Sequence, residues 1–222
     1  MKQLTCLALI ALFSLQLSAQ QPSDEWYVGG VKLTDNSYRR GQVKYDLKRD
    51  IVQLRVDDLT ETYSPRQLIS FNVASFTDED RKARQGLTPS KTFYSLPLIN
   101  KNGYKQLHFF EVVVEGKATL LAREYEKNII ANNGQRVIKG RSVKGAVVSD
   151  PEELIESELA HHMYIGTLDG TIRKLPLKRK GVLALFNDHQ SSLKEFIKQE
   201  ELFLNKLPDM ARLFRYYNSL ED

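Results

Sequence analysis

Residues 107–125 read LHFFEVVVEGKATLLAREY, the most apolar stretch of the chain after its first twenty residues. Valine and phenylalanine are common in strands because they pack well on a pleated, half-buried surface. Glu115 and Gly116 interrupt the apolar run. The stretch is therefore interpreted either as two strands joined by a tight turn or as one buried strand that crosses the core. Both alternatives place a β-sheet at the centre of the protein.

The segments that precede this stretch alternate between apolar and polar residues. GQVKYDL (41–47) and IVQLRVDD (51–58) are apolar at every second position. Successive side chains of a strand point to opposite faces, so this pattern is typical of a sheet with one buried and one solvated face. Turn-forming segments such as TDNS (34–37) and NKNG (100–103) separate the strand candidates. The pattern predicts five to eight short antiparallel strands in this region.

Beyond residue 150 the spacing of apolar residues changes to that of helices. Three segments place apolar residues three and four positions apart, as helices with one buried face do: 178–188, 191–202 and 207–220. In the last segment, Leu213, Phe214 and Tyr217 share one face, and we expect this face in the core.

Two further elements are predicted ahead of these helices. DPEELIESELA (150–160) has an aspartate cap, a proline at the first helical position and glutamates in the first turn, which together indicate the start of a helix. HMYIGTLDGTIRKL (162–175) is a hairpin candidate, because Asp169 and Gly170 suit a two-residue turn.

These patterns predict an α+β protein that is mainly β. An antiparallel twisted sheet or open barrel is followed by a small C-terminal unit made of a hairpin and helices. The predicted divisions are a signal peptide, a β-rich domain, a flexible basic linker, and a hairpin with a helical tail: 1–19, 20–127, 128–150 and 151–222.

The first nineteen residues have the parts of a secretory signal peptide. Lys2 is followed by the apolar run 7–13, and the small residue Ala19 ends the leader. The run is shorter than the roughly 20 residues that a membrane-spanning helix needs. Cys6, the single cysteine, lies too early for a lipid-anchor site and leaves with the leader. We therefore expect a cysteine-free mature chain that is exported to the periplasm, the cell surface or the medium.

The charge of the chain gives no argument for a nucleic-acid partner, and none is predicted. The formal net charge is +4, and loss of Lys2 with the leader lowers it by one. Such a small excess does not form a single-sign face of the kind that nucleic acids require. No segment of the mature chain is apolar enough to cross a membrane. The oligomeric state is left open.

The adjacent His161 and His162 invite a metal-site interpretation. Neighbouring residues of a strand point to opposite faces, so a regular strand cannot bring both rings to one ion. A third ligand would have to come from His108, His189 or a carboxylate. We therefore predict that the two rings lie on opposite sides of one strand, with no metal and no cofactor, and keep a metal site at the pair as the weaker alternative.

Other catalytic motifs are absent from the sequence. It contains no G-x-S-x-G, G-x-x-x-x-G-K-[ST] or G-x-G-x-x-G motif, and the mature chain has no cysteine. Its acidic clusters DEDR (78–81) and VDDL (56–59) are expected in solvated loops. A glycosidase would need two carboxyl groups held across a pocket, which a sequence cannot show. No catalytic residue is predicted.

Two groups of residues are the candidates for binding. Aromatic side chains at the start of the mature chain, Trp26 and Tyr27, have the chemistry to stack on sugars or anchor a protein partner. The segment 128–150 carries basic residues with no acid before Asp150, and it is interpreted as a solvated linker or as a contact strip for an acidic partner. Its basic residues are Arg136, Lys139, Arg141 and Lys144.

Five segments together resemble uncharacterised exported envelope proteins of Gram-negative bacteria, which have a β-rich N-terminal region and a short helical tail. They are EWYVGGVKLTDNSYRRGQVKYDL (25–47), ETYSPRQLISFNV (61–73), FFEVVVEGKATLL (109–121), LKRKGVLALFNDHQSSLKEFIKQEEL (177–202) and ARLFRYYN (211–218). The resemblance implies this architecture and no activity or site residue.

Two functions are therefore carried forward. The first is an exported non-enzymatic binding or accessory protein of the cell envelope, whose sheet binds another envelope protein or a polysaccharide. The alternative is a secreted hydrolase of glycan or lipid, whose dispersed carboxylates converge in the fold.

Overall fold

A computed structural model describes residues 25–73, 90–100, 102–132, 135–138, 154–167, 169–176, 178–186 and 188–220. Within them lie eleven strands: β1 (Tyr27–Leu33), β2 (Tyr38–Asp46), β3 (Ile51–Val56), β4 (Leu59–Tyr63), β5 (Leu68–Val73), β6 (Lys91–Ile99), β7 (Lys105–Val114), β8 (Ala118–Asn132), β9 (Gln135–Ile138), β10 (Leu154–Thr167) and β11 (Ile172–Lys174). Three helices follow in the same part of the chain: α2 (Arg179–Leu183), α3 (Gln190–Gln199) and α4 (Leu207–Ser219). No helix of the described residues is long and apolar enough to cross a membrane.

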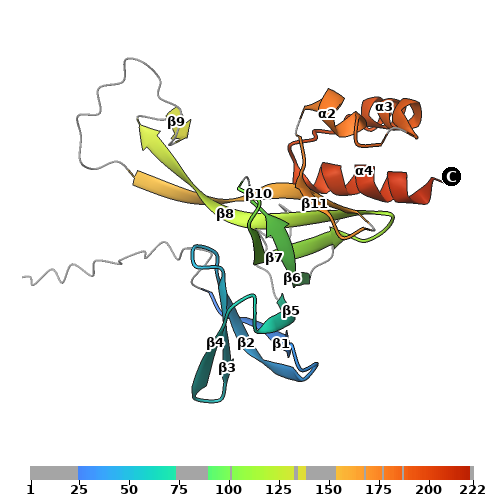
Figure 1. Ribbon diagram of the computed structural model, residues 1–222. Helices are drawn as coiled ribbons and strands as arrows, with labels where there is room; N and C mark the ends of the chain where they lie inside the picture. The colour runs from blue at the N-terminus through green and yellow to red at the C-terminus, as the bar shows by residue number, and fades with distance from the viewer. Residues whose placement is uncertain are drawn as a thin grey trace, which may run out of the picture.

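All of these strands belong to one antiparallel sheet. Its order is β11-β10-β8-β7-β6-β5-β1-β2-β3-β4, and β9 pairs with β8 beside this path. Figure 1 shows β1–β4 at one end of the sheet and α4 lying along β8 and β10 at the other, with α2 and α3 beyond α4. The predicted fold class, α+β and mainly β with an open antiparallel sheet, is confirmed.

The apolar stretch 107–125 forms two strands and not one. β7 ends at Val114 and β8 begins at Ala118, so the turn falls at Glu115 and Gly116 as the first alternative predicted. A bulge between Val112 and Val114 interrupts the register of the pair. Bulges increase the local twist of a sheet, and this one lies where the sheet meets the helices.

β10 replaces the helix that was predicted to begin at Asp150. The strand pairs with β8 over its whole length, from Leu154 opposite Ala131 to Thr167 opposite Ala118. The helix signals of this segment were wrong, because a long run of inter-strand hydrogen bonds outweighs the weak local preference of a helix start. The predicted domain boundary at residue 127 falls inside β8, and residues 135–138 of the predicted linker form β9.

The hairpin and the three later helices form where they were predicted. β10 and β11 pair around Asp169 and Gly170, and Gly170 has the positive φ of 77° that such turns require. In α4, Leu213 and Phe214 are fully buried. They belong to a cluster that joins the helices to β7, β8 and β10.

A second apolar cluster fills the other end of the sheet on the same side of the strands. Its aromatic centre comes from β2, β5, β6 and β7, where the rings of Phe71 and Phe93 stack with centroids 4.5 Å apart. Phe109 belongs to this cluster, and Glu111, two positions further along β7, pairs with Ala122 of the first. The two cores therefore meet on β7.

The Asn218 side chain joins the end of α4 to the β7–β8 turn, and Lys117 of the turn also donates to the Leu220 carbonyl oxygen. The Asn218 amide nitrogen donates to the carbonyl oxygen of Ala118 at 2.9 Å, and its amide oxygen accepts the Ala118 backbone N–H at 3.0 Å. A Cβ on Gly116 would lie 2.1 Å from the same amide group. Glycine at this position lets the helix end approach the hairpin closely.

Candidate functional site

The two adjacent histidines lie on opposite faces of β10, as predicted. His161 is paired with Glu124 of β8, and its Nε2 atom lies 3.6 Å from the Glu124 carboxylate. His162 stacks on Tyr125 on the other face, with ring centroids 4.1 Å apart. A metal site made by the pair itself does not fit this geometry.

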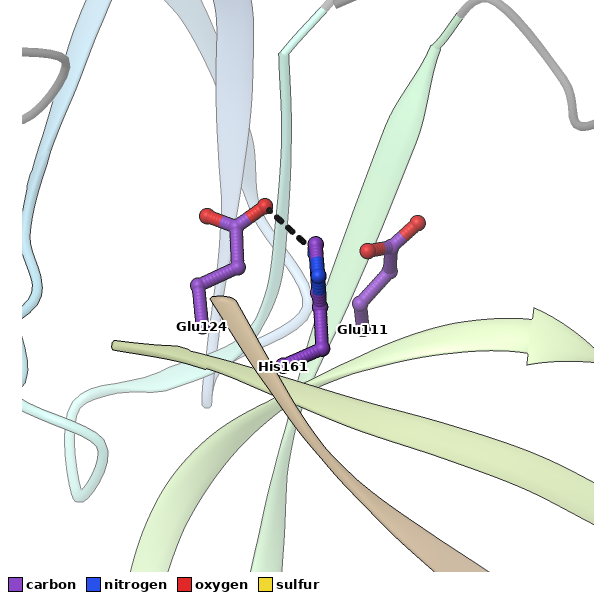
Figure 2. Close-up of side chains that lie close together, drawn as sticks. All are labelled: Glu111, Glu124 and His161. Atoms are coloured by element: carbon purple, nitrogen blue, oxygen red, sulfur yellow. Dashed lines mark ion pairs between the residues drawn. The ribbon is translucent and has the colours of Figure 1, made fainter. Parts of the chain in front are cut away.

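His161 belongs to a buried polar cluster at the junction of the two cores. Its other members are Lys91 of β6, Glu111 of β7 and Glu124 of β8. Lys91 and Glu111 are 6% and 1% exposed, and the Glu124 side chain is 7% exposed. Figure 2 shows the His161 ring between the two carboxylates. Four ionisable groups from four neighbouring strands thus meet in one space, in which the His161 side chain is 21% exposed and the other three are almost fully buried.

The central contact of this cluster is an ion pair. The Lys91 ammonium lies 2.5 Å from the Glu124 carboxylate. Burial by itself would raise the pKa of Glu124, but the Lys91 charge and the nearby His161 ring outweigh burial and lower the pKa to about 2. Glu124 is therefore an anion at neutral pH. A glycosidase acid has the opposite property, a carboxyl pKa raised by its pocket.

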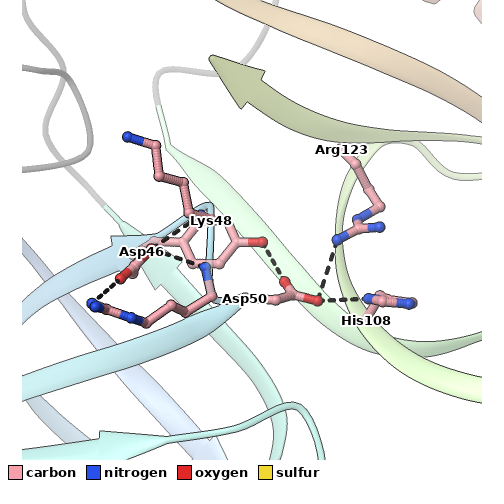
Figure 3. A network of polar contacts seen from close by, with 7 residues as sticks. Asp46, Lys48, Asp50, His108 and Arg123 are labelled. Carbon is pink, nitrogen blue, oxygen red and sulfur yellow. Dashed lines mark hydrogen bonds and ion pairs between the residues drawn. The ribbon is translucent and has the colours of Figure 1, made fainter.

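A second polar network lies where the β2–β3 turn meets β7 and β8. Asp50 accepts the Tyr45 hydroxyl at 2.6 Å, lies 2.7 Å from His108 Nδ1, and accepts an Arg123 N–H at 3.2 Å (Figure 3). Lys48 of the same turn lies 2.8 Å from Glu126 of β8. Pairing between β7 and β8 ends at Glu111 and Ala122, so the turn contacts both strands near the point where they separate.

The other two histidines lie away from His161. His108 contacts Asp50 in this second network, and His189 lies at the start of α3, 3.6 Å from Asp188. The carboxylates beside His161 are Glu111 and Glu124. The signal that could have identified them is the alternation of 107–125, in which both glutamates occupy positions that would otherwise be apolar and inward-facing.

The opposite face of the same strands carries an open apolar groove of about 590 Å³. Its floor covers a small cluster around Phe110, Leu121 and Tyr164. Its walls are β6 and β11, which come close without pairing. The lining residues are Tyr94, Leu96, Pro97, Val112, Glu115, Gly116, Thr119, Leu121, Gly166, Thr167, Gly170, Thr171 and Ile172.

Both walls of the groove have backbone edges without a strand partner in the described part of the chain. β6 pairs with β5 only from Lys91 to Tyr94, so along residues 95–99 its backbone pairs with β7 alone among the described strands, and the Ser95 hydroxyl donates to the Pro65 carbonyl oxygen. β11 pairs only with β10. Pro97, which has no N–H to donate, lies on the open edge of β6, where prolines are tolerated.

Trp26 and Tyr27, the aromatic binding candidates taken from the sequence, do not line this groove. Trp26 is half-buried under Arg55, whose guanidinium carbon lies 3.9 Å from the ring centroid. Tyr27 begins β1 and donates its hydroxyl to Glu25. Of the basic residues, Arg136 lies in β9, whereas the other three and the signal peptide lie outside the described residues: Lys139, Arg141, Lys144 and 1–19.

The protein is thus an open antiparallel sheet that helices cover at one end. One face of the sheet carries the buried ionic cluster, and the other face carries the apolar groove. Comparison with protein-family models, curated proteins and solved structures returned no match for this chain.

The environment of His162 predicts a pH dependence of stability. Burial lowers the pKa of this ring, and the charges of Lys174 and Arg123 lower it further. A histidine whose pKa is lower in the folded state contributes stability above its unfolded pKa of about 6.5 and loses it as the pH falls. Urea melts at pH 7.5 and 5.5 should therefore show a larger loss for the wild type than for His162→Gln. Parallel losses would contradict this assignment.

Proposed function

We propose that this chain is an exported, non-enzymatic accessory protein of the cell envelope that binds an extended apolar segment of a partner protein. The binding site is the groove between β6 and β11. The leader supports the location of the protein, and the groove supports the mode of binding.

The observation that carries this proposal is an apolar groove whose walls are unpaired strand edges among the described residues. A polypeptide in an extended conformation can add its backbone to such an edge, while alternate side chains enter the apolar pockets beside it. Main-chain hydrogen bonds supply affinity, and the pockets supply specificity. The sheet then gains a strand at the position where β6 and β11 leave a gap.

The chemistry of the lining favours a polypeptide over a polysaccharide. Five of the lining residues are aliphatic, among them Leu96, Val112 and Ile172, and the polar members of the lining are three threonines and Glu115. Sugar sites rely on aromatic faces that stack on the ring, and Tyr94 is the aromatic residue of this lining. An uncharged, apolar strand matches these walls better.

Selection from a peptide library displayed on phage tests the proposal. The mature protein should enrich sequences with apolar residues at alternate positions, and a synthetic copy should bind with one-to-one stoichiometry. Leu96→Asp places a carboxylate in the groove and should weaken binding by at least about tenfold, which corresponds to about 1.4 kcal/mol. Fluorescence anisotropy measures both affinities.

Leu59→Asp is the matched control, because Leu59 is 72% exposed on β4, at the far end of the sheet. It should bind the selected peptide as the wild type does. Equal loss in both variants, no enriched sequence, or peptide-induced NMR shifts confined to β1–β4 would each overturn the proposal. If the protein instead bound oligosaccharides and Leu96→Asp abolished that binding, the groove would be a glycan site and not a peptide site.

A further inference from the structure

The buried cluster on the opposite face from the groove has the donors of a metal site. One carboxylate oxygen of Glu111, one of Glu124 and a ring nitrogen of His161 all lie within 4.8 Å of one another. The three residues come from β7, β8 and β10, so the register of the sheet fixes their separation. Rigid strands hold ligands more closely in place than loops do.

We propose that Glu111, Glu124 and His161 bind a divalent transition-metal ion of the zinc type. This site is independent of the proposed peptide groove, because it lies on the other face of the same strands. The loss of either one leaves the other in place.

The His161 ring gives this cluster a feature that a simple ion-pair network does not explain. Its Nε2 atom is inaccessible to solvent and has no hydrogen-bond partner among the residues that the structure describes, and its contact with the Glu124 carboxylate oxygen, at 3.6 Å, is too long for a hydrogen bond. A buried polar atom without a partner costs free energy. A metal ion between the ring and the carboxylates would supply the missing bond, because neutral imidazole nitrogen is a common metal ligand.

Lys91 competes with the metal for Glu124. Its ammonium lies 2.5 Å from the Glu124 carboxylate and supplies a positive charge to the cluster in the absence of an ion. A divalent ion would have to displace this contact before it gains Glu124 as a ligand. The affinity of the site for a metal ion therefore depends on how strongly the Lys91 ammonium holds Glu124. Removal of Lys91 should strengthen metal binding.

The donor set selects among metals. One imidazole and two carboxylates are the mixed nitrogen and oxygen ligands that suit zinc, whereas calcium requires six to eight oxygen ligands. Three protein ligands would leave a fourth position for water, as in zinc sites that are not purely structural.

Isothermal titration of the tag-free mature protein with Zn²⁺ alone tests the proposal. The wild type should bind one ion per chain, and Ca²⁺ should give no heat. His161→Ala and Glu111→Gln should each weaken zinc binding by more than about tenfold. Substitution of a residue that only hydrogen-bonds to a metal ligand already lowers metal affinity by about this factor. Lys91→Met should bind zinc more tightly than the wild type, and zinc should raise its melting temperature by more.

His162→Ala is the matched control. It removes an adjacent imidazole that faces the other side of β10, so its zinc affinity should equal that of the wild type. Zinc binding that is lost equally in His161→Ala and His162→Ala would mean adventitious surface binding and overturn the site. Absence of zinc binding to both the wild type and Lys91→Met would overturn it as well. Neither outcome affects the peptide groove, which Leu96→Asp tests separately.

Discussion

Replacing Lys91 by Met should lower the free energy of unfolding by about 3–5 kcal/mol. Lys91 is 6% exposed, and the Glu124 carboxylate beside it is equally buried. Removal of the ammonium leaves an anion in a desolvated space with a histidine and a second carboxylate. Equilibrium urea unfolding at pH 7 without added metal measures the loss.

Two comparisons separate the buried charge from the general effect of losing a lysine. The double variant Lys91→Met with Glu124→Gln should recover much of the lost stability, because replacing both partners of a buried pair is far less costly than removing one. Arg212→Met removes an ion pair with Glu200 in which both side chains are more than 40% exposed, and it should cost less than about 1 kcal/mol. Equal losses in Lys91→Met and Arg212→Met would show that the cluster is solvated.

Replacing Phe214 by Ala should cost about 3–5 kcal/mol of unfolding free energy. Its side chain is 0% exposed and meets Phe186 edge to face, with ring centroids 5.5 Å apart. The variant leaves a cavity in the apolar cluster that joins the helices to the sheet, beside Phe186. Guanidinium melts followed by circular dichroism give the difference.

Phe203→Ala is the control for this position, since Phe203 is an aromatic residue of the same helical region that is 59% exposed. Its loss should change stability by about 0.5 kcal/mol or less, as surface substitutions usually do. A cost below about 1 kcal/mol for Phe214→Ala would mean that the helices do not pack on the sheet, and the face of α4 would then be a docking surface.

Most strands and helices could be predicted because each follows a local period. Alternation identified β2 and β3, and the spacing of three and four identified α3 and α4. β10 could not be predicted in the same way. Its first residues carry helix signals, and its strand conformation depends on β8, whose paired residues lie more than twenty positions earlier in the chain.

The candidate site likewise has features that the sequence predicts and features that depend on strand pairing. Alternation was sufficient to predict that His161 and His162 face opposite sides, since this property belongs to any regular strand. It could not predict that His161 faces Glu124, nor that Lys91 reaches the same carboxylate from 33 positions away. Those contacts depend on the register of four strands, and no local preference encodes register between segments so far apart.

The groove also depends on the arrangement of strands that are distant in the sequence. Leu96 and Ile172 are unremarkable apolar residues of two short strands when they are considered alone, and they face one another only because the sheet curls until β11 approaches β6. The amino-acid order of this protein was thus enough to establish its three helices, most of its strands and the alternation of side chains along them, because these depend on neighbours in the chain. The pairing of distant strands established the ionic cluster and the groove, because only cooperative packing of the whole sheet determines which distant residues meet.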